Sequence, residues 1–168
     1  MRALVQRVAR ARVSIEGRVA GSIEAGLLVL LGATHDDREA DIAWLARRIA
    51  GLRVFADAQG RMNSDVRECG GAALVVPQFT LYGDARFGRR PDWSAAARPE
   101  AAEPMFEAFC AALVADGVRV ERGLFRAHME VELLNDGPVT LMIESPRPGG
   151  AGEAPDGGAI APPDGGAR

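Results

Sequence analysis

Asn135-Asp136-Gly137-Pro138-Val139-Thr140 separates two apolar runs near the end of the chain. In the run before it, apolar and polar side chains alternate from position 128 to position 133, a pattern that predicts a half-buried strand. Leu141-Met142-Ile143 after it predicts a second, short strand. Glycine tolerates backbone angles that other residues avoid, and proline fixes its own φ and has no N–H. We therefore expect a rigid turn between two strands, with a Gly–Pro bond that could be cis. An ordinary hairpin turn has the same signature, so these residues alone predict no function.

A second stretch, Val75-Val76-Pro77-Gln78-Phe79-Thr80-Leu81-Tyr82-Gly83, places polar and aromatic side chains at the end of an apolar run. Thr80 is a candidate nucleophile, or it could orient a water molecule. The backbone N–H groups of Phe79 and Thr80 could stabilise a developing oxyanion. The alternative is that Thr80 is only a β-branched strand residue.

Composition indicates one globular domain without an overall basic character. The chain has 168 residues, of which 48% are hydrophobic and 26% charged, and its net charge is −3. A nucleic-acid partner would therefore need a local patch. All 20 positively charged side chains are arginine, which suits bidentate phosphate contacts. Cys69 and Cys110 lie in no metal-type spacing, and two reduced thiols are expected. No signal peptide or membrane-spanning run is evident, so we expect a cytoplasmic protein with no membrane partner.

Turn signals and apolar periodicity divide the chain into short elements. The expected strands are 2–8, 12–16, 18–20, 26–32, 53–55, 72–76, 118–121, 128–134 and 141–143, and the expected helices are 34–50 and 99–114. This order predicts a mixed α/β fold with largely antiparallel β-sheets, barrel-like or arranged as a layered sandwich, covered by two main helices. We expect a domain at 1–144 and a disordered Pro/Gly-rich tail at 145–168.

The usual catalytic motifs are missing from the sequence. It has no Gly-x-Ser-x-Gly motif, no phosphate-binding glycine loop and no His/Cys/Asp cluster with metal spacing, so we expect no metal and no cofactor. His35 and His128 are more typical of solvated side chains than of a catalytic pair. A conventional triad or metal hydrolase is therefore disfavoured.

Pro77-Gln78-Phe79-Thr80-Leu81 and Asn135 to Thr140 together resemble the two signatures of the D-aminoacyl-tRNA deacylase family, also called D-tyrosyl-tRNA deacylases. The similarity continues in order through Gln6-Arg7-Val8, Gly26 to Gly32, Phe55-Ala56-Asp57 and Gly88-Arg89-Arg90-Pro91, and it covers residues 1–144. It implies a homodimer, with active sites at the interface, that hydrolyses the ester between a D-amino acid and the 3′ ribose of tRNA and rejects L-aminoacyl-tRNA.

Site residues follow from the same resemblance. Gln78, Phe79 and Thr80 would line the catalytic site and hold the aminoacyl group, largely through the backbone. Gly137 and Pro138 would form the chirality filter, with a cis bond that reaches into the partner subunit's pocket. The remaining residues assigned to substrate binding are Asn135, Thr140 and Arg7, of which Arg7 would support the Gly-Pro turn. Much of the chemistry would depend on the substrate's own 2′-hydroxyl. Because an excluding filter cannot reject a missing side chain, glycyl-tRNA should also be a substrate.

Two alternatives remain open at this point. Pro77 stands where the family commonly has serine, and a related branch with proline there has a trans Gly-Pro bond and acts on certain L-aminoacyl-tRNAs. That branch has a smaller residue at the position of Phe79. The other alternative is a non-catalytic tRNA- or DNA-binding module, since Arg86, Arg89 and Arg90 lie beside aromatic residues and could bind tRNA phosphates. A solvated loop partly neutralised by nearby aspartates explains these arginines equally well.

Overall fold

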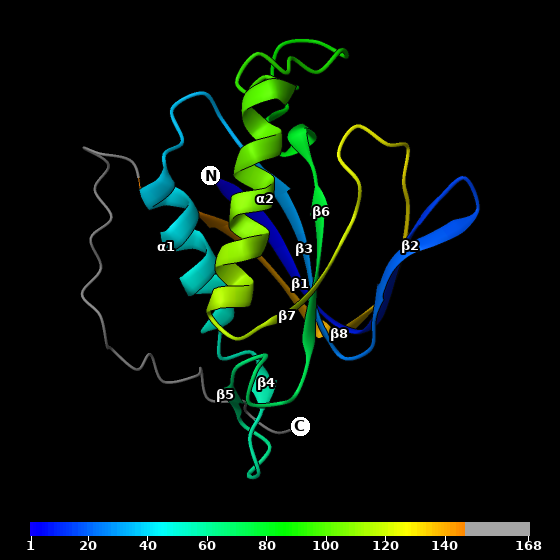
Figure 1. The fold of residues 1–168 in the computed structure, drawn as a ribbon, viewed down its shortest axis with the longest axis vertical. Coiled ribbons are helices and arrows are strands. Elements are labelled where there is room, and N and C mark those ends of the chain that lie inside the picture. The colour runs from blue at the N-terminus through cyan, green and yellow to red at the C-terminus, as the bar shows by residue number, and fades with distance from the viewer. Residues whose placement is uncertain (147–168) are drawn as a thin grey trace, which may run out of the picture.

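The structure is a computed structural model that describes residues 1–146. It contains a six-stranded sheet with two helices on one face, and a separate two-stranded sheet (Figure 1). The strand order is β2 (Arg18–Ile23), β1 (Arg2–Ile15), β3 (Gly26–Gly32), β6 (Ala72–Pro77) and β7 (Arg119–Arg122), with β8 (Glu130–Glu144) paired to β1. Gly21 of β2 lies so close to β7 that an added Cβ would be 3.1 Å from the Arg122 carbonyl oxygen. The sheet therefore curls into a nearly closed barrel, which confirms the mixed α/β, largely antiparallel prediction in its barrel-like form.

Strand β1 (Arg2–Ile15) organises the sheet. Its first half pairs antiparallel with β3 (Gly26–Gly32) and its second half with β2 (Arg18–Ile23). Both halves also pair with β8 (Glu130–Glu144). The prediction of two separate strands here was wrong, because β8 supports the backbone across the exposed Ala9 and Arg10 that interrupt the apolar pattern. The predicted hairpin at Gly17 is confirmed, and Gly17 has φ +74°.

Strand β3 is buried on both faces, which explains its unbroken apolar run. Leu27 and Val29 belong to the core between the sheet and the helices, whereas Leu28 belongs to a second core on the opposite face. β6 (Ala72–Pro77) runs parallel to β3, and β7 (Arg119–Arg122) runs parallel to β6. Parallel neighbours need crossover connections, and the two helices supply them.

Helices α1 (Glu39–Ala50) and α2 (Pro99–Ala115) pack on the same face of the sheet (Figure 1). The position predicted for α2 is confirmed. The predicted start of α1 at Thr34 was wrong, because acidic side chains bind the free amides ahead of this helix. The Asp37 carboxylate accepts a hydrogen bond from the Thr34 amide at 2.8 Å, and the Asp41 carboxylate accepts one from the Arg38 amide at 2.9 Å.

Strand β8 corrects the prediction of two strands joined by a turn. Asn135 pairs with Val8 and Thr140 pairs with Gln6, so residues 136–139 bulge out opposite Arg7. Pairing with β1 resumes on both sides of the bulge, and the two runs therefore form one strand. Proline fits this position because it cannot donate a hydrogen bond to the ladder and the ladder is interrupted there.

The small sheet pairs β4 (Phe55–Ala56) with β5 (Met62–Ser64). The strand predicted at 53–55 therefore begins at Phe55 instead of Arg53, and β5 was not predicted. Ser145, which begins the expected tail, is buried, and its amide donates a hydrogen bond to the Met1 carbonyl at 2.9 Å. The rest of that tail, from residue 147 onward, lies outside the described residues. Within the described part of the chain, neither helix is both long and apolar enough to cross a membrane.

Candidate active site

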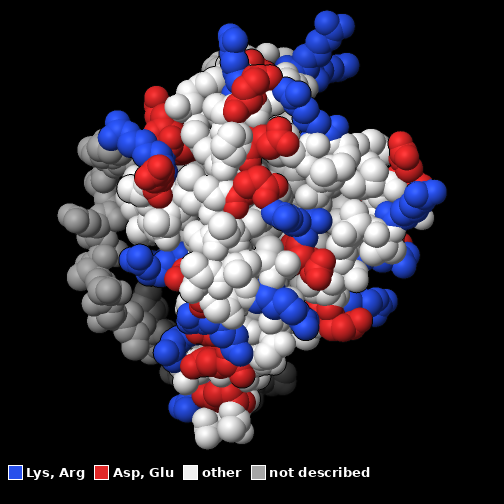
Figure 2. Space-filling view, viewed as in Figure 1, with Lys and Arg blue, Asp and Glu red and all other residues white. Residues whose placement is uncertain are grey.

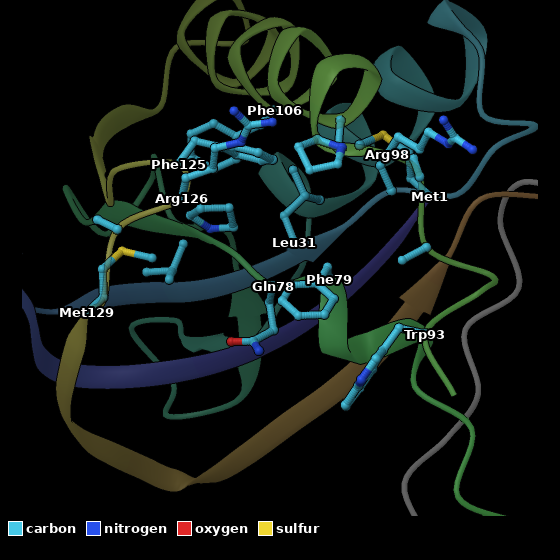
Figure 3. Close-up of a pocket in the computed structure, with 18 of the residues that line it drawn as sticks. Met1, Leu31, Gln78, Phe79, Trp93, Arg98, Phe106, Phe125, Arg126 and Met129 are labelled. Atoms are coloured by element: carbon cyan, nitrogen blue, oxygen red, sulfur yellow. The ribbon is translucent and has the colours of Figure 1, made fainter. Parts of the chain in front are cut away.

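A cavity of about 870 Å³ opens where β6 ends, beneath the first half of α2 (Figure 3). Pro77 is the last residue of β6 and Gln78 follows it, Phe106 comes from α2, and Phe125 comes from the loop at 123–129. The rings of Phe106 and Phe125 lie 6.3 Å apart between centroids and make one wall apolar. A cavity of this size with a few polar groups suits a small organic ligand or the end of a larger one.

Gln78 and Phe79 line this cavity, whereas Thr80 is not among the lining residues. Phe79 and Thr80 begin a short 3-10 helix, η1 (Phe79–Tyr82). The Thr80 hydroxyl accepts a hydrogen bond from the Gln78 side-chain amide. Within residues 1–146, the backbone amides of Phe79 and Thr80 donate to no other element. As the first amides of a helix they also lack an intrahelical acceptor, so both N–H groups are available to a ligand oxygen.

Trp93 holds Phe79 in place. The two rings meet edge to face with centroids 5.4 Å apart. The Trp93 ring also lies directly against Gly83, and a Cβ on that residue would clash with it. Trp93 also lines the cavity. Its packing against Phe79 could not be predicted, since spacing along the chain does not show which side chains pack together.

The cavity wall carries positive and neutral polar groups but no carboxylate. Arg98 and Arg126 line it, as do His35 and His128, the two histidines of the chain. Both histidines were expected to be merely solvated. They are exposed, yet they share this cavity, and a His35 ring nitrogen lies 2.9 Å from the Ser94 carbonyl oxygen. In a chain with 23 acidic side chains and net charge −3, a wall without carboxylates favours an anionic ligand.

The Gly137–Pro138 bulge lies outside this cavity. The peptide bond is cis, and Gly137 has φ +122°. A Cβ at Gly137 would come within 2.8 Å of Arg7 Nη2, the end of a flexible side chain, so it is the backbone angle that requires glycine. Neither Gly137 nor Pro138 lines the cavity that contains Gln78 and Phe79. One chain therefore does not bring the two signatures together.

Arg7 and Asn135 hold the base of the bulge. Arg7 Nε donates to the Asp136 carbonyl at 3.3 Å and lies 3.0 Å from its carboxylate, while Arg7 Nη1 donates to the Val54 carbonyl. The Asn135 side-chain amide donates to the carbonyls of Arg7 at 2.9 Å and Val139 at 3.2 Å. Thr140 is exposed, and its hydroxyl accepts a hydrogen bond from the Gln6 side chain at 3.3 Å. These contacts fix the bulge to β1.

The arginine-rich loop at 84–92 extends beyond the start of α2 (Figure 1), and its ends are joined by two backbone hydrogen bonds of 2.8 Å between Asp84 and Asp92. Arg86 is held by the Asp84 carboxylate, and this hydrogen-bonded pair lowers the pKa of Asp84 to about 2. Arg89 and Arg90 form no ion pair within residues 1–146. Figure 2 shows positive side chains at the top of the view, where this loop lies. On the rest of the face that is shown, positive and negative side chains are interspersed. Only part of the predicted patch is thus free of an acidic partner.

No metal site is evident among residues 1–146, where no group of three or more His, Cys, Asp or Glu side chains is arranged to hold an ion. Burial raises the pKa of the Cys110 thiol to about 12, which removes it as a nucleophile near neutral pH. The chemical groups at the site are therefore amide N–H donors, the Gln78 side chain, histidines and arginines.

The family model described as D-Tyr-tRNA(Tyr) deacylase matches residues 4–144. This chain belongs to that family. The D-aminoacyl-tRNA deacylase of Symbiobacterium thermophilum is 57% identical over 145 residues, covering 86% of this chain and 96% of the relative. The enzyme of the same name from Thermus aquaticus is also 57% identical over 145 residues, covering 86% and 95% of the two chains.

Solved structures agree with the deacylase family fold. A protein described as c-Myc DNA Unwinding Element Binding Protein superimposes with a TM-score of 0.82 at 37% identity, covering 88% of this chain and 100% of its own. A probable eukaryotic D-amino acid tRNA deacylase superimposes with a TM-score of 0.71 at 17% identity, covering 85% and 98%, and supports the fold alone. The resemblance of the two sequence signatures to this family is thereby confirmed.

Proposed function

We propose that this protein hydrolyses the ester bond of D-aminoacyl-tRNA and releases the free D-amino acid and tRNA. The observation that carries the proposal is the 57% identity to curated D-aminoacyl-tRNA deacylases across nearly their whole length. In the reaction water adds to the ester carbonyl, the acyl–oxygen bond breaks, and the 3′ oxygen of the ribose leaves with a proton. Charged tRNA is a cytoplasmic substrate, and we place the protein there.

The cavity binds the aminoacylated 3′ end of the tRNA. Its apolar wall suits a nucleic-acid base, because bases stack on aromatic side chains and the half-buried Phe125 lines this wall, with the buried Phe106 behind it. At the opposite side, the amides of Phe79 and Thr80 suit the oxygen of the reacting carbonyl, which becomes negative as water adds. The substrate's 2′-hydroxyl lies beside the ester and can assist the reaction. Protein side chains then mainly position the substrate.

Chirality is filtered by the Gly137–Pro138 bulge of a second subunit. Its backbone carbonyls crowd the side of the α-carbon where an L side chain would project. A second subunit is needed because the bulge does not line the cavity of its own chain. Exposed apolar side chains lie on both sides of the bulge along β8, which supports contact with another copy: they are Leu133, Leu134, Leu141 and Met142. Light scattering should give the mass of two chains, and a monomer at working concentration would contradict this arrangement.

The direct test of function is release of tyrosine from tRNA charged with D-tyrosine or with L-tyrosine. Rapid release of D-tyrosine with L-tyrosine retained is expected. Rapid release from the L-aminoacyl substrate would instead favour the related branch suggested by Pro77. Binding of tRNA without release of either would favour a non-catalytic nucleic-acid-binding module, the role suggested by the description of one similar structure.

A further inference from the structure

Arg126 has a backbone conformation that arginine seldom adopts. Its φ is +64°, and within residues 1–146 the other non-glycine residue with positive φ is Glu16. Glu16 precedes Gly17 in the β1–β2 hairpin, where a two-residue turn requires positive φ. Arg126 lies in a longer loop, where glycine would meet the same backbone angle without strain. Strained residues of this kind are concentrated at binding and catalytic sites.

The strained backbone places Arg126 in the cavity wall, next to Phe125. Figure 3 shows Phe125, Phe106 and Arg126 grouped on the side of the cavity across from Gln78 and Phe79. The acyl group is assigned to the Gln78 side and the base to the phenylalanines. Arg126 therefore lies on the base side of the cavity, away from the acyl group.

The present partner of Arg126 is exchangeable. Its guanidinium lies 2.6 Å from the Glu100 carboxylate of α2, but the two side chains are 58% and 73% exposed. Ion pairs this exposed contribute little to stability. No carboxylate lines the cavity itself, so an anion entering it meets no fixed negative charge in the wall. A phosphate can replace Glu100 and accept two parallel hydrogen bonds from the planar guanidinium.

We propose that Arg126 binds the phosphodiester on the 5′ side of the terminal adenosine, exchanging Glu100 for the phosphate. This inference rests on the proposed function, because it assigns the cavity to the aminoacylated end of tRNA. It adds a contact that neither of the two sequence signatures contains. The bound phosphate fixes one end of the terminal nucleotide while the amides of Phe79 and Thr80 hold the other.

The test uses two hydrolysis-resistant probes, so that binding is measured without chemistry. Both are 3′-(D-tyrosylamino)-3′-deoxyadenosine; one has a free 5′-hydroxyl and the other a 5′-methyl phosphate diester, which carries the single negative charge of RNA. The wild-type protein should bind the phosphate-bearing probe about tenfold more tightly, the effect expected of one charge-assisted contact. Equal affinity for both probes, or binding of neither, overturns the proposal.

Three variants separate phosphate binding from a structural role. Arg126→Gly keeps the backbone angle free of strain and should abolish the preference for phosphate while leaving affinity for the phosphate-free probe unchanged. Arg122→Ala is the matched control, since Arg122 is also paired with a glutamate of α2, Glu107, but does not line the cavity; it should keep the preference. Glu100→Gln breaks the same ion pair as Arg126→Gly but should strengthen the preference, because Arg126 is freed.

If the Arg126–Glu100 ion pair only holds the loop against α2, Glu100→Gln and Arg126→Gly should both weaken binding, and each should weaken it equally for the two probes. That result, or a phosphate preference retained in Arg126→Gly, contradicts the assignment. Hydrolysis of D-tyrosyl-tRNA by the wild-type protein is measured in parallel. If that hydrolysis fails while the phosphate preference holds, the proposed reaction is wrong and the phosphate site stands.

Discussion

Thr80 lies beside the cavity and not in its wall, with its hydroxyl bonded to the Gln78 side chain. Its side chain therefore positions Gln78, while its backbone amide remains available to substrate. We predict that Thr80→Ala lowers kcat by less than about tenfold, whereas removal of a true nucleophile costs on the order of a millionfold in a serine protease. Steady-state release of D-tyrosine measures this. Complete loss of turnover, with intact dimer and tRNA binding, would make Thr80 the nucleophile.

Trp93 is a positioning residue for Phe79. An edge-to-face aromatic pair contributes about 0.5–1.5 kcal/mol beyond the buried area. Trp93→Ala should therefore lower kcat/KM for D-tyrosyl-tRNA by about 2- to 10-fold, with rescue by Trp93→Phe. Phe87→Ala is the control, since Phe87 is 89% exposed in the same loop and should have little effect on kcat. Loss of activity in Trp93→Phe equal to that in Trp93→Ala would argue against positioning through the aromatic contact.

Asp65 stabilises the turn that leads into β6. The Arg67 guanidinium and nearby backbone amides lower the pKa of this buried carboxyl to about 2. A depressed pKa adds stability above the unfolded value of about 3.9. That stability is lost as the pH falls through about 2. We predict that Asp65→Asn is less stable by about 1–2 kcal/mol near neutral pH. Between about pH 3.9 and about pH 2, its free energy of unfolding should change less than that of the wild-type protein.

Denaturant unfolding at several pH values tests the turn. Asp36→Asn is the control, because the Asp36 side chain is exposed and forms no ion pair within residues 1–146. We expect the control to unfold with nearly the wild-type pH dependence. An Asp65→Asn variant as stable as the wild-type protein at neutral pH would show that the turn does not depend on the charge.

The elements predictable from sequence are those whose signal is local. Periodicity and turn residues located α2 and β3 because burial repeats along a single element. The continuity of β8 through Gly137–Pro138 could not be predicted, since it depends on pairing with β1 about 130 residues away. The same limit applies to the site: the signature containing Gln78 was evident, but the opposite wall at Phe106 and Phe125 requires knowledge of which elements face each other.

For the molecule as a whole, the net charge of −3 does not attract tRNA. A local group of positive side chains must therefore do so. Arg89 and Arg90 have no acidic partner among the described residues, while Arg86 is bound to Asp84. We predict that Arg89→Ala with Arg90→Ala reduces the slope of log affinity against log salt by about 1.4–1.8, and that Arg86→Ala reduces it by less. Titrations of tRNA at several salt concentrations measure this. An unchanged slope in the double variant would place the tRNA contact elsewhere.

The filter proposed for Gly137–Pro138 is a rigid stretch of backbone that excludes L side chains and does not grip D side chains. One tRNA charged in turn with glycine, D-alanine or L-alanine, and followed for ester loss at equal enzyme concentration, tests it most directly. Since an attractive pocket separates ligands that differ by one methylene by only about 1–3 kcal/mol, near-complete refusal of L-alanine requires exclusion. We expect rapid loss of glycine and D-alanine with L-alanine retained. Rapid loss of D-alanine with glycine left intact, or rapid loss of L-alanine, would contradict it.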